Sequence, residues 1–215
     1  MLKTVMYNFL YTFVMKYLDF RQFFKDFTVI AYQDIKNVFG KVNHTQLVGW
    51  RKKGLLIKVK RGMFILPDEK VDLHIIANEL NYSYISLEYA LSYYQIIPDI
   101  ARVITSVSRG RNEKIQNSTG FFYYRKIIGK LFTGYTLIKS SRGSRMFRMA
   151  TPEKALFDLV YFRQDMKESK DFESLRLSLP ADFKIAEIKK YERAVKAPQI
   201  KIRLNKLIKY LYDGV

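Results

Sequence analysis

The stretch NHTQLVGWRKKGLLIKVKRGMFILP, residues Asn43–Pro67, predicts a short basic helix followed by a basic hairpin. Asn43 can cap the helix, because its side chain can accept a hydrogen bond from the backbone at the third helical position, Gln46. Gly54 suits the left-handed conformation that ends many helices. We therefore expect a helix of about ten residues between the cap and this glycine.

The two sides of this helix differ in character. At about 100° per residue, Leu47 and Trp50 fall on one side, which predicts a buried face. The residues expected on the other side are short, polar or cationic: Thr45, Gly49, Lys52 and Lys53. From Lys41 to Arg61 there are seven Lys or Arg residues and no Asp or Glu.

A two-stranded hairpin is predicted after the helix. Ile57 and Val59 alternate with Lys58 and Lys60, as in a half-buried strand. Lys60, Arg61 and Gly62 then form a tight turn into the apolar segment MFILP. The tip of this hairpin is therefore cationic.

Residues 21–40, RQFFKDFTVIAYQDIKNVFG, predict two further short helices before the basic one. Tyr32, Ile35, Val38 and Phe39 have the spacing of a buried helical stripe. Helices followed by a basic hairpin predict a winged helix-turn-helix, whose last helix enters the major groove of DNA while the hairpin follows the phosphate backbone. A run of charge alone is usually a solvated face, but this ordered context favours nucleic acid.

The residues of this predicted domain, 19–67, divide by reach into two sets. Three could contact base edges: Thr45, Gln46 and Lys52. Five are better placed for phosphates, which position a protein without specifying sequence: Arg51, Lys53, Lys58, Lys60 and Arg61. His44 is interpreted as a surface residue and Trp50 as core. Because one such domain covers about half a helical turn, we expect double-stranded DNA with an inverted repeat, bound by two copies.

Charge and composition agree with a polyanionic partner. The 215 residues carry a net charge of +18, with a sequence pI near 9.9. The absence of Cys excludes disulfides and thiolate metal sites, and the two His, His44 and His74, are far apart. No metal or cofactor is predicted. The sequence also shows no paired carboxylates, no Ser/His/Asp set and no phosphate-binding Gly loop, so we expect no enzyme activity.

The charge is divided into blocks along the chain. Residues 1–70 have a net charge of +8, residues 71–101 of −4, residues 102–149 of +10 and residues 150–215 of +4. The segment LPDEK, Leu66–Lys70, is the best predicted domain boundary. Two basic blocks on either side of an acidic one suggest two separate anion-binding surfaces.

The N-terminal segment MLKTVMYNFLYTFVMKYL, residues 1–18, is predicted to be an additional helix. Its apolar run is too short to span a bilayer and lacks a signal-peptide cleavage site. An alternative is that translation begins at Met15. We expect a cytoplasmic protein without a membrane partner.

Residues 71–215 predict a second, mixed α/β domain with a helical tail, so that the chain as a whole is α+β. Ser86 can cap a helix that runs to Gln95, and Thr151 caps one that begins TPEKALFDLVYF. Asp158 on that helix is interpreted as helix surface. The predicted strands lie between the two helices: RVITSVS, GFFYYRKI, YTLIKSS and RMFRMA. One or two amphipathic helices, broken at Pro198, follow.

Several of these pieces, in this order behind a winged helix, carry a resemblance: MFILPDEKVDLHIIANEL, YISLEYALSYYQIIPD, ITSVSRGR, GFFYYRKI and FRMATPEKALFDLVYF. Over about residues 20–165 the chain resembles the AbiE-type antitoxin and transcriptional regulator family of type IV toxin–antitoxin systems. The resemblance implies repression of its own operon by the N-terminal domain. It also implies that the C-terminal domain counteracts a nucleotidyltransferase toxin without a stable complex. The N-terminal extension and the C-terminal tail depart from the family.

If the second basic block serves the antitoxin role, its candidate residues are Arg109, Arg111, Arg125, Lys126, Arg145 and Arg148, because arginine in turns and strand ends can bind phosphate in bidentate fashion. The interleaved aromatic and cationic residues of GFFYYRK leave an alternative open. Phe121, Tyr123 and Arg125 on one strand face could stack RNA bases, so the protein would be an RNA-binding regulator. The same alternation is also typical of a half-buried sheet.

Overall fold

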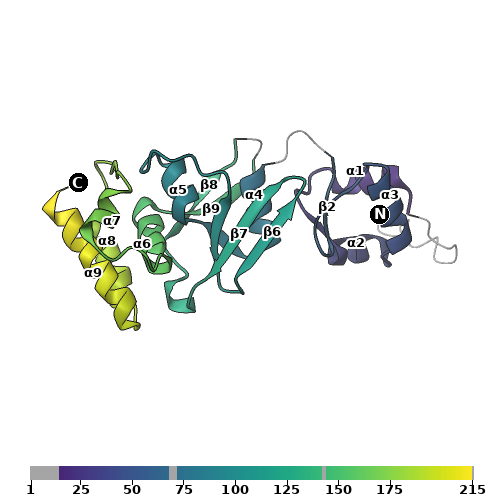
Figure 1. Ribbon diagram of the computed structural model, residues 1–215. Helices are drawn as coiled ribbons and strands as arrows, with labels where there is room; N and C mark the ends of the chain where they lie inside the picture. The colour runs from purple at the N-terminus through teal and green to yellow at the C-terminus, as the bar shows by residue number, and fades with distance from the viewer. Residues whose placement is uncertain (1–14, 68–71, 142–143, 215) are drawn as a thin grey trace, which may run out of the picture. The chain divides into compact units, whose positions relative to one another are not determined.

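A computed structural model describes residues 15–67, 72–141 and 144–214 (Figure 1). The chain is a mixed α+β protein that divides into two compact units, Met1–Asp68 and Glu69–Val215. The division falls within the segment Leu66–Lys70. Most of the predicted N-terminal extension, residues 1–14, lies outside the described residues.

The first unit consists of short helices and a small antiparallel sheet, in which the strands follow the order β1-β3-β2. Its elements are α1 (Tyr17–Phe24), β1 (Ile30–Ala31), α2 (Tyr32–Phe39), α3 (His44–Lys52), β2 (Ile57–Lys60) and β3 (Met63–Ile65). Helices α2 and α3 and the hairpin were predicted, whereas the short strand β1 was not. Helix α1 begins in the segment predicted as the N-terminal extension and overlaps the predicted helices of residues 21–40 only at its end.

Aromatic rings fill the core of this unit. The Trp50 ring lies 5.3 Å from Tyr17 and 5.0 Å from Phe20, measured between ring centroids. Ile35 is buried with them, and partly buried side chains of α2, among them Val38, pack against the same cluster. The interpretation of Trp50 as a core residue and the predicted stripe of α2 are confirmed.

Local signals in the sequence set the bounds of α3. Gly40 has a φ of 72° and donates its N–H to the Lys36 carbonyl at 2.9 Å, which ends α2. The Asn43 side chain accepts a hydrogen bond from the Gln46 N–H at 3.1 Å, as predicted. Gly54, with a φ of 70°, follows the end of α3. The predicted cap and stop are therefore confirmed.

The second unit is built on a six-stranded mixed sheet in the order β6-β7-β5-β4-β9-β8. The β4–β9 and β5–β7 pairs are parallel and the other pairs are antiparallel. The strands are β4 (Ser83–Ile85), β5 (Ile104–Ser108), β6 (Glu113–Asn117), β7 (Gly120–Lys126), β8 (Tyr135–Lys139) and β9 (Met146–Ala150). The four predicted strands are present, while β4 and β6 were missed.

Helices cover this sheet unequally. On one face, α4 (Leu73–Leu80) is tied to the sheet because its Ala77 carbonyl accepts a hydrogen bond from the Tyr124 hydroxyl at 2.8 Å. On the other face lie α5 (Leu87–Tyr93) and α6 (Pro152–Phe162), where Tyr84 donates its hydroxyl to Asp158 at 3.0 Å. A 3₁₀ turn, Gly129–Leu131, connects β7 to β8.

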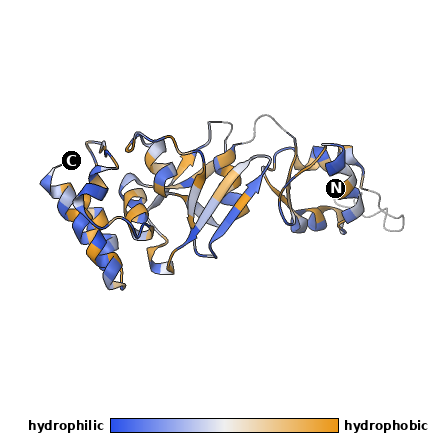
Figure 2. Ribbon diagram, viewed as in Figure 1, coloured by the Kyte–Doolittle hydropathy of each residue, from blue (hydrophilic) through white to orange (hydrophobic). Residues whose placement is uncertain are grey.

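The C-terminal helices continue from α6. They are α7 (Ser169–Glu173), α8 (Ile185–Arg193) and α9 (Pro198–Asp213), so Pro198 begins the last helix, as the predicted break requires. Figure 2 shows hydrophobic and hydrophilic residues alternating around α9, whose Leu204 and Leu207 are buried. Among the described residues, no helix is both long and apolar enough to cross a membrane.

Asp158 was interpreted as ordinary helix surface, and this was wrong. Its side chain is fully buried and forms an ion pair with Lys154, one turn earlier on α6. Ser86 also donates its hydroxyl to Asp158, at 2.8 Å, so this hydroxyl does not cap α5. A buried carboxylate needs several partners, and in this unit those partners outcompete the local cap.

Candidate nucleic-acid interface

Helix α3 places its cations outward. Leu47 and Trp50 are buried against the core, which orients the opposite side of the helix to solvent. On that side Thr45 and Lys52 are exposed, and Arg51 and Lys53 are exposed on its flanks. The predicted division of the helix into an apolar and a cationic side is confirmed.

Gln46 does not share this outward orientation. Its side-chain N–H₂ group donates a hydrogen bond to the Met15 carbonyl, and its Oε1 atom is buried without a hydrogen-bond partner among the described residues. The side chain therefore links α3 to Met15, two residues before α1. Of the residues predicted to reach base edges, Thr45 and Lys52 remain accessible, whereas Gln46 is engaged inside the unit.

The hairpin carries the second set of cations. Lys58 and Arg61 are exposed, Lys60 is half-buried and Val59 is buried in the core. The pairing of β2 with β3 is irregular between Lys58 and Lys60, which indicates a β-bulge. Gly62, with a φ of 74°, completes the turn at the tip.

Tyr32 connects the hairpin tip to α3. Its backbone N–H donates to the Gly62 carbonyl at 2.9 Å, and a Cβ on Gly62 would come within 2.9 Å of its ring. The same ring meets the His44 ring edge-on, at 4.9 Å between centroids. The first residue of α3 and the hairpin tip therefore flank one side chain. Sequence reasoning placed Tyr32 in the core stripe and missed this connection.

Little opposite charge compensates these cations. Within the part of the chain that the structure describes, no ion pair is formed by Arg51, Lys52, Lys53, Lys58 or Arg61. Of the carboxylates in this unit, Asp34 accepts the Ala31 N–H at the start of α2. The α3 and hairpin cations are thus available to an external anion, and phosphate is the anion that Lys and Arg commonly bind on nucleic acids.

The candidate antitoxin residues of the second unit do not form one surface. Arg148 donates to the Ser83 carbonyl at 2.8 Å and stacks on Tyr82, with 4.6 Å from its guanidinium carbon to the ring centroid. Arg145 forms an ion pair with Glu79 at 2.8 Å. Both arginines are occupied by contacts within the unit.

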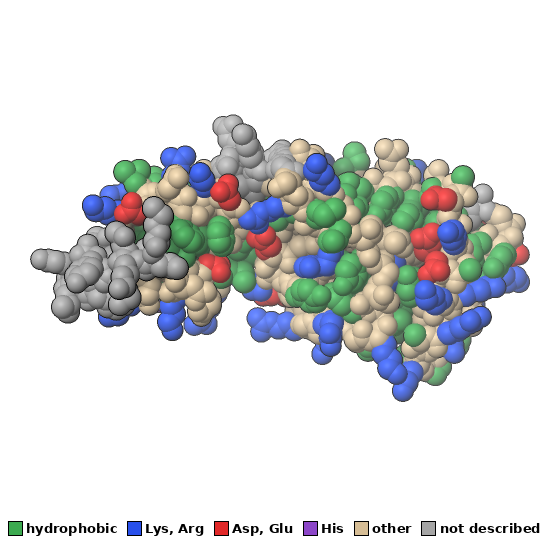
Figure 3. All heavy atoms as spheres, turned by 180° about the vertical axis from the view of Figure 1, so that it is seen from behind, with side chains coloured by type: hydrophobic (Ala, Val, Ile, Leu, Met, Phe, Trp, Pro, Cys, Tyr) green, Lys and Arg blue, Asp and Glu red, His purple; other side chains and the backbone are tan. Residues whose placement is uncertain are grey.

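The other four candidates lie elsewhere on the sheet. Arg125 and Lys126 are consecutive in β7 and therefore point to opposite faces. Arg109 and Arg111 are exposed in the loop after β5, and Arg111 pairs with Glu113 at 3.6 Å. Figure 3 shows Lys and Arg side chains spread over the face of this unit that it presents, without a single basic block.

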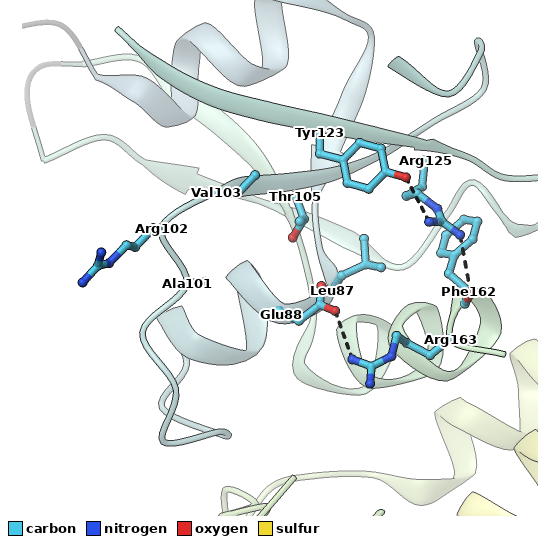
Figure 4. A pocket seen from close by; sticks show the side chains of 10 residues that line it. All are labelled: Leu87, Glu88, Ala101, Arg102, Val103, Thr105, Tyr123, Arg125, Phe162 and Arg163. Carbon is cyan, nitrogen blue, oxygen red and sulfur yellow. Dashed lines mark hydrogen bonds and ion pairs between the residues drawn. The ribbon is translucent and has the colours of Figure 1, made fainter. Parts of the chain in front are cut away.

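A pocket of about 370 Å³ lies in the second unit, beside Tyr123 and Arg125. It is lined by Leu87, Glu88, Ala101, Arg102, Val103, Thr105, Tyr123, Arg125, Phe162 and Arg163 (Figure 4). Of these residues, the sequence singled out Tyr123 and Arg125 for ligand binding. The others come from α5, from β5 and the loop before it, and from the end of α6 with Arg163 after it, and only the fold brings them together.

Comparison of the sequence with protein-family models and with curated proteins finds no match. Among the described residues, no three His, Asp or Glu side chains are grouped in a way that could hold a metal ion. The geometry of the two units is therefore the basis for a functional proposal.

Proposed function

We propose that this protein is a DNA-binding transcriptional repressor whose first unit is a winged helix-turn-helix. The order helix, strand, helix, helix and hairpin supports this assignment, and so does the four-residue turn with Gly40 between α2 and α3. Helix α3 is the recognition helix and the β2–β3 hairpin is the wing.

The observation that carries the proposal is the position of Tyr32 between His44 and Gly62. A recognition helix and a wing must meet the duplex together, the helix in the major groove and the wing on the backbone. Tyr32 holds the start of α3 and the hairpin tip to one another, and both elements carry cations without ion-pair partners among the described residues. Phosphate contacts from Arg51, Lys53, Lys58 and Arg61 position the domain, while Thr45 and Lys52 face the bases.

The antitoxin role rests on the resemblance to the AbiE-type family. On this basis we propose that the protein represses the operon of a toxin–antitoxin pair and that its second unit counteracts a nucleotidyltransferase toxin. The exposed candidates for that role are Arg109, Arg111 and Lys126. Arg145 and Arg148 support the fold of the unit through the contacts described above.

Footprinting on the DNA upstream of the protein's own gene tests the repressor proposal. The expected result is an inverted repeat protected by two copies, with the protection lost when Lys52, Lys53 and Arg61 are replaced by Ala. Random DNA of the same length is the control. Equal protection of both DNAs by the wild-type protein would contradict sequence-specific repression.

A further inference from the structure

We infer that the second unit carries a site for single-stranded nucleic acid on the β5–β6–β7 part of its sheet, distinct from the duplex-binding surface of the first unit. The site consists of the ring faces of Phe121 and Tyr123, the cations beside them, and the pocket next to Tyr123. It does not depend on the repressor proposal, because it uses residues of the other unit.

Strand β7 presents two aromatic rings on the same face. Phe122 and Tyr124 are buried on the face covered by α4, so Phe121 and Tyr123 point to the opposite face. Phe121 is 51% exposed, and its neighbour across the strand pair is the exposed Gln116. In Figure 2 the edge strand β6 is mainly hydrophilic, as expected of a strand that borders solvent.

The spacing of the two rings fits bases that are not stacked on one another. Residues two apart on a strand are separated by about 6.6 Å, whereas neighbouring bases in a duplex are about 3.4 Å apart. Phe121 and Tyr123 can therefore each take one base of an extended single strand. A duplex cannot use them, because its bases are already stacked and paired.

Two cations, Lys114 and Arg125, lie beside the Tyr123 ring. The Lys114 ammonium lies 5.1 Å from the centre of the Tyr123 ring, on the neighbouring edge strand. Its flexible, exposed side chain can move to a phosphate when a base takes its place. Arg125 is fixed more firmly, because it donates to the Tyr123 hydroxyl at 3.1 Å and its guanidinium carbon lies 4.8 Å from the centre of the Phe162 ring.

The pocket continues this surface and has room for one more base. Its volume of about 370 Å³ lies within the range of about 300–1,000 Å³ that is usual for small-molecule sites. Figure 4 shows Tyr123 and Thr105 on its strand side, Leu87 on its helix side and Arg102 pointing away from the others. Its walls are largely apolar, as a nucleobase requires.

The charge around the pocket favours an anion. Among its lining residues, three are arginines and Glu88 is the acid. Glu88 lies 3.7 Å from the Arg163 guanidinium, which is also bonded to Asp165 outside the pocket. An aromatic surface with surplus cations is typical of proteins that bind single strands through base stacking and phosphate contacts.

The test uses the full-length chain carrying Ala at Arg51, Lys52, Lys53, Lys58 and Arg61, which removes the DNA contacts proposed for the cations of the first unit. Binding to fluorescein-labelled oligo(U) and oligo(dT) of about 12 nucleotides is measured by fluorescence anisotropy, with a duplex of the same length beside them. We expect both single strands, or one of them, to bind more tightly than the duplex. Comparison of oligo(U) with oligo(dU), which differ only in the 2′-hydroxyl, identifies whether the ribose contributes.

Leucine substitutions isolate stacking from apolar contact. Phe121→Leu and Tyr123→Leu keep apolar bulk but remove the ring, and each should weaken binding by roughly 5- to 150-fold. Phe121→Tyr keeps the ring and should retain the affinity. Tyr212→Leu is the matched control, because Tyr212 is 57% exposed on α9, outside the site. Circular dichroism verifies that each variant folds. If Tyr123→Leu does not fold, the comparison of Phe121→Leu with Phe121→Tyr still tests stacking, because Phe121 is exposed.

Three results would overturn the inference: no binding of either single strand, equal binding of the duplex, or equal effects of Phe121→Leu and Tyr212→Leu. A different result would contradict the repressor proposal, namely that the wild-type protein does not bind its upstream duplex. A protein that binds its upstream duplex but no single strand would leave that proposal intact and remove this one.

Discussion

The backbone N–H of Tyr32 donates a hydrogen bond to the carbonyl of Gly62, at 2.9 Å, and this bond ties the hairpin tip to the start of α2. The Tyr32 ring lies directly over Gly62 as well, so that a Cβ there would meet the ring at 2.9 Å. The position of the hairpin therefore depends on a residue that has no side chain.

Gly62→Ala should destabilise the first unit by about 1–3 kcal/mol, because a left-handed φ is unfavourable for alanine and the added methyl group meets the Tyr32 ring. Gly40→Ala separates the two causes, since Gly40 has a φ of 72° but no atom within 4 Å of its Cβ position. Gly40→Ala should therefore lose only the stability that comes from the unfavourable φ, without the loss from a steric contact. Denaturant unfolding measures both.

Gly49→Ala is the control for both substitutions. Gly49 lies within α3, and its Cβ position is open. Alanine there should stabilise the helix by about 0.5–1 kcal/mol relative to glycine. If all three variants lose the same stability, the conformations of Gly62 and Gly40 do not explain their effects.

Gln46→Ala should reduce stability rather than DNA specificity. The substitution removes the hydrogen bond from the Gln46 side chain to the Met15 carbonyl, which should cost about 1 kcal/mol. Thr45→Ala, on the exposed side of the same turn, should leave stability nearly unchanged and weaken discrimination at one base position. The free energy of unfolding and a competition assay between operator and single-base variants distinguish the two. A specificity change confined to Gln46→Ala would show that this side chain turns outward on DNA.

The buried pair of Lys154 and Asp158 should be sensitive to loss of one partner. Burial lowers the pKa of Lys154 and raises that of Asp158, while their mutual attraction opposes both shifts. Lys154→Met would leave the Asp158 carboxyl buried with the Tyr84 and Ser86 hydroxyls alone, and should cost about 3–5 kcal/mol.

Lys190→Met provides the exposed comparison, because Lys190 pairs with Glu187 at 3.4 Å on the surface of α8. Pairs of this kind contribute about 0–1 kcal/mol. The losses of unfolding free energy in the two variants, measured by thermal or denaturant unfolding, should therefore differ by roughly 2–5 kcal/mol. Equal losses would mean that the Lys154 ammonium is not needed by the core.

Asp72 should make the stability of the second unit depend on acid pH. Burial raises the pKa of Asp72, but hydrogen bonds from the Ser140 hydroxyl and the His74 backbone N–H, with the charge of His74, lower it by more. The folded pKa is thus below the unfolded value of about 3.9. The stabilisation is fully present above that unfolded value and is lost as the pH falls through the folded pKa.

Asp72→Asn tests this directly. The difference in unfolding free energy between wild type and variant should be largest above about pH 5 and should shrink as the pH falls below about 4. Urea unfolding of both proteins at a series of pH values across this range measures the difference. A difference that stays constant down to about pH 2 would exclude Asp72 as the linked group.

Local sequence signals were sufficient to predict helix α3 of the first unit. The cap at Asn43, the glycine at Gly54 and the apolar side formed by Leu47 and Trp50 act within a few residues, so their positions in the chain are enough to predict α3. The exposure of its cations follows from the same periodicity.

The sequence did not predict the roles of residues that depend on long-range contacts. Gln46 was predicted to reach DNA because its helical position is right, but Met15, 31 residues away, accepts its hydrogen bond. Arg148 resembles a surface arginine until the fold brings the Ser83 carbonyl and the Tyr82 ring to it. Neither partner can be found from spacing along the chain.

The salt dependence of duplex binding tests the central claim, that α3 and the hairpin bind DNA, most directly. If Arg51, Lys53, Lys58 and Arg61 contact phosphates, the logarithm of the binding constant should fall with the logarithm of salt concentration with a slope of about −3.6 per bound copy. Replacing Lys53, Lys58 and Arg61 by Ala should reduce the slope to about −1. A wild-type slope shallower than about −2, or one unchanged by these substitutions, would contradict the account.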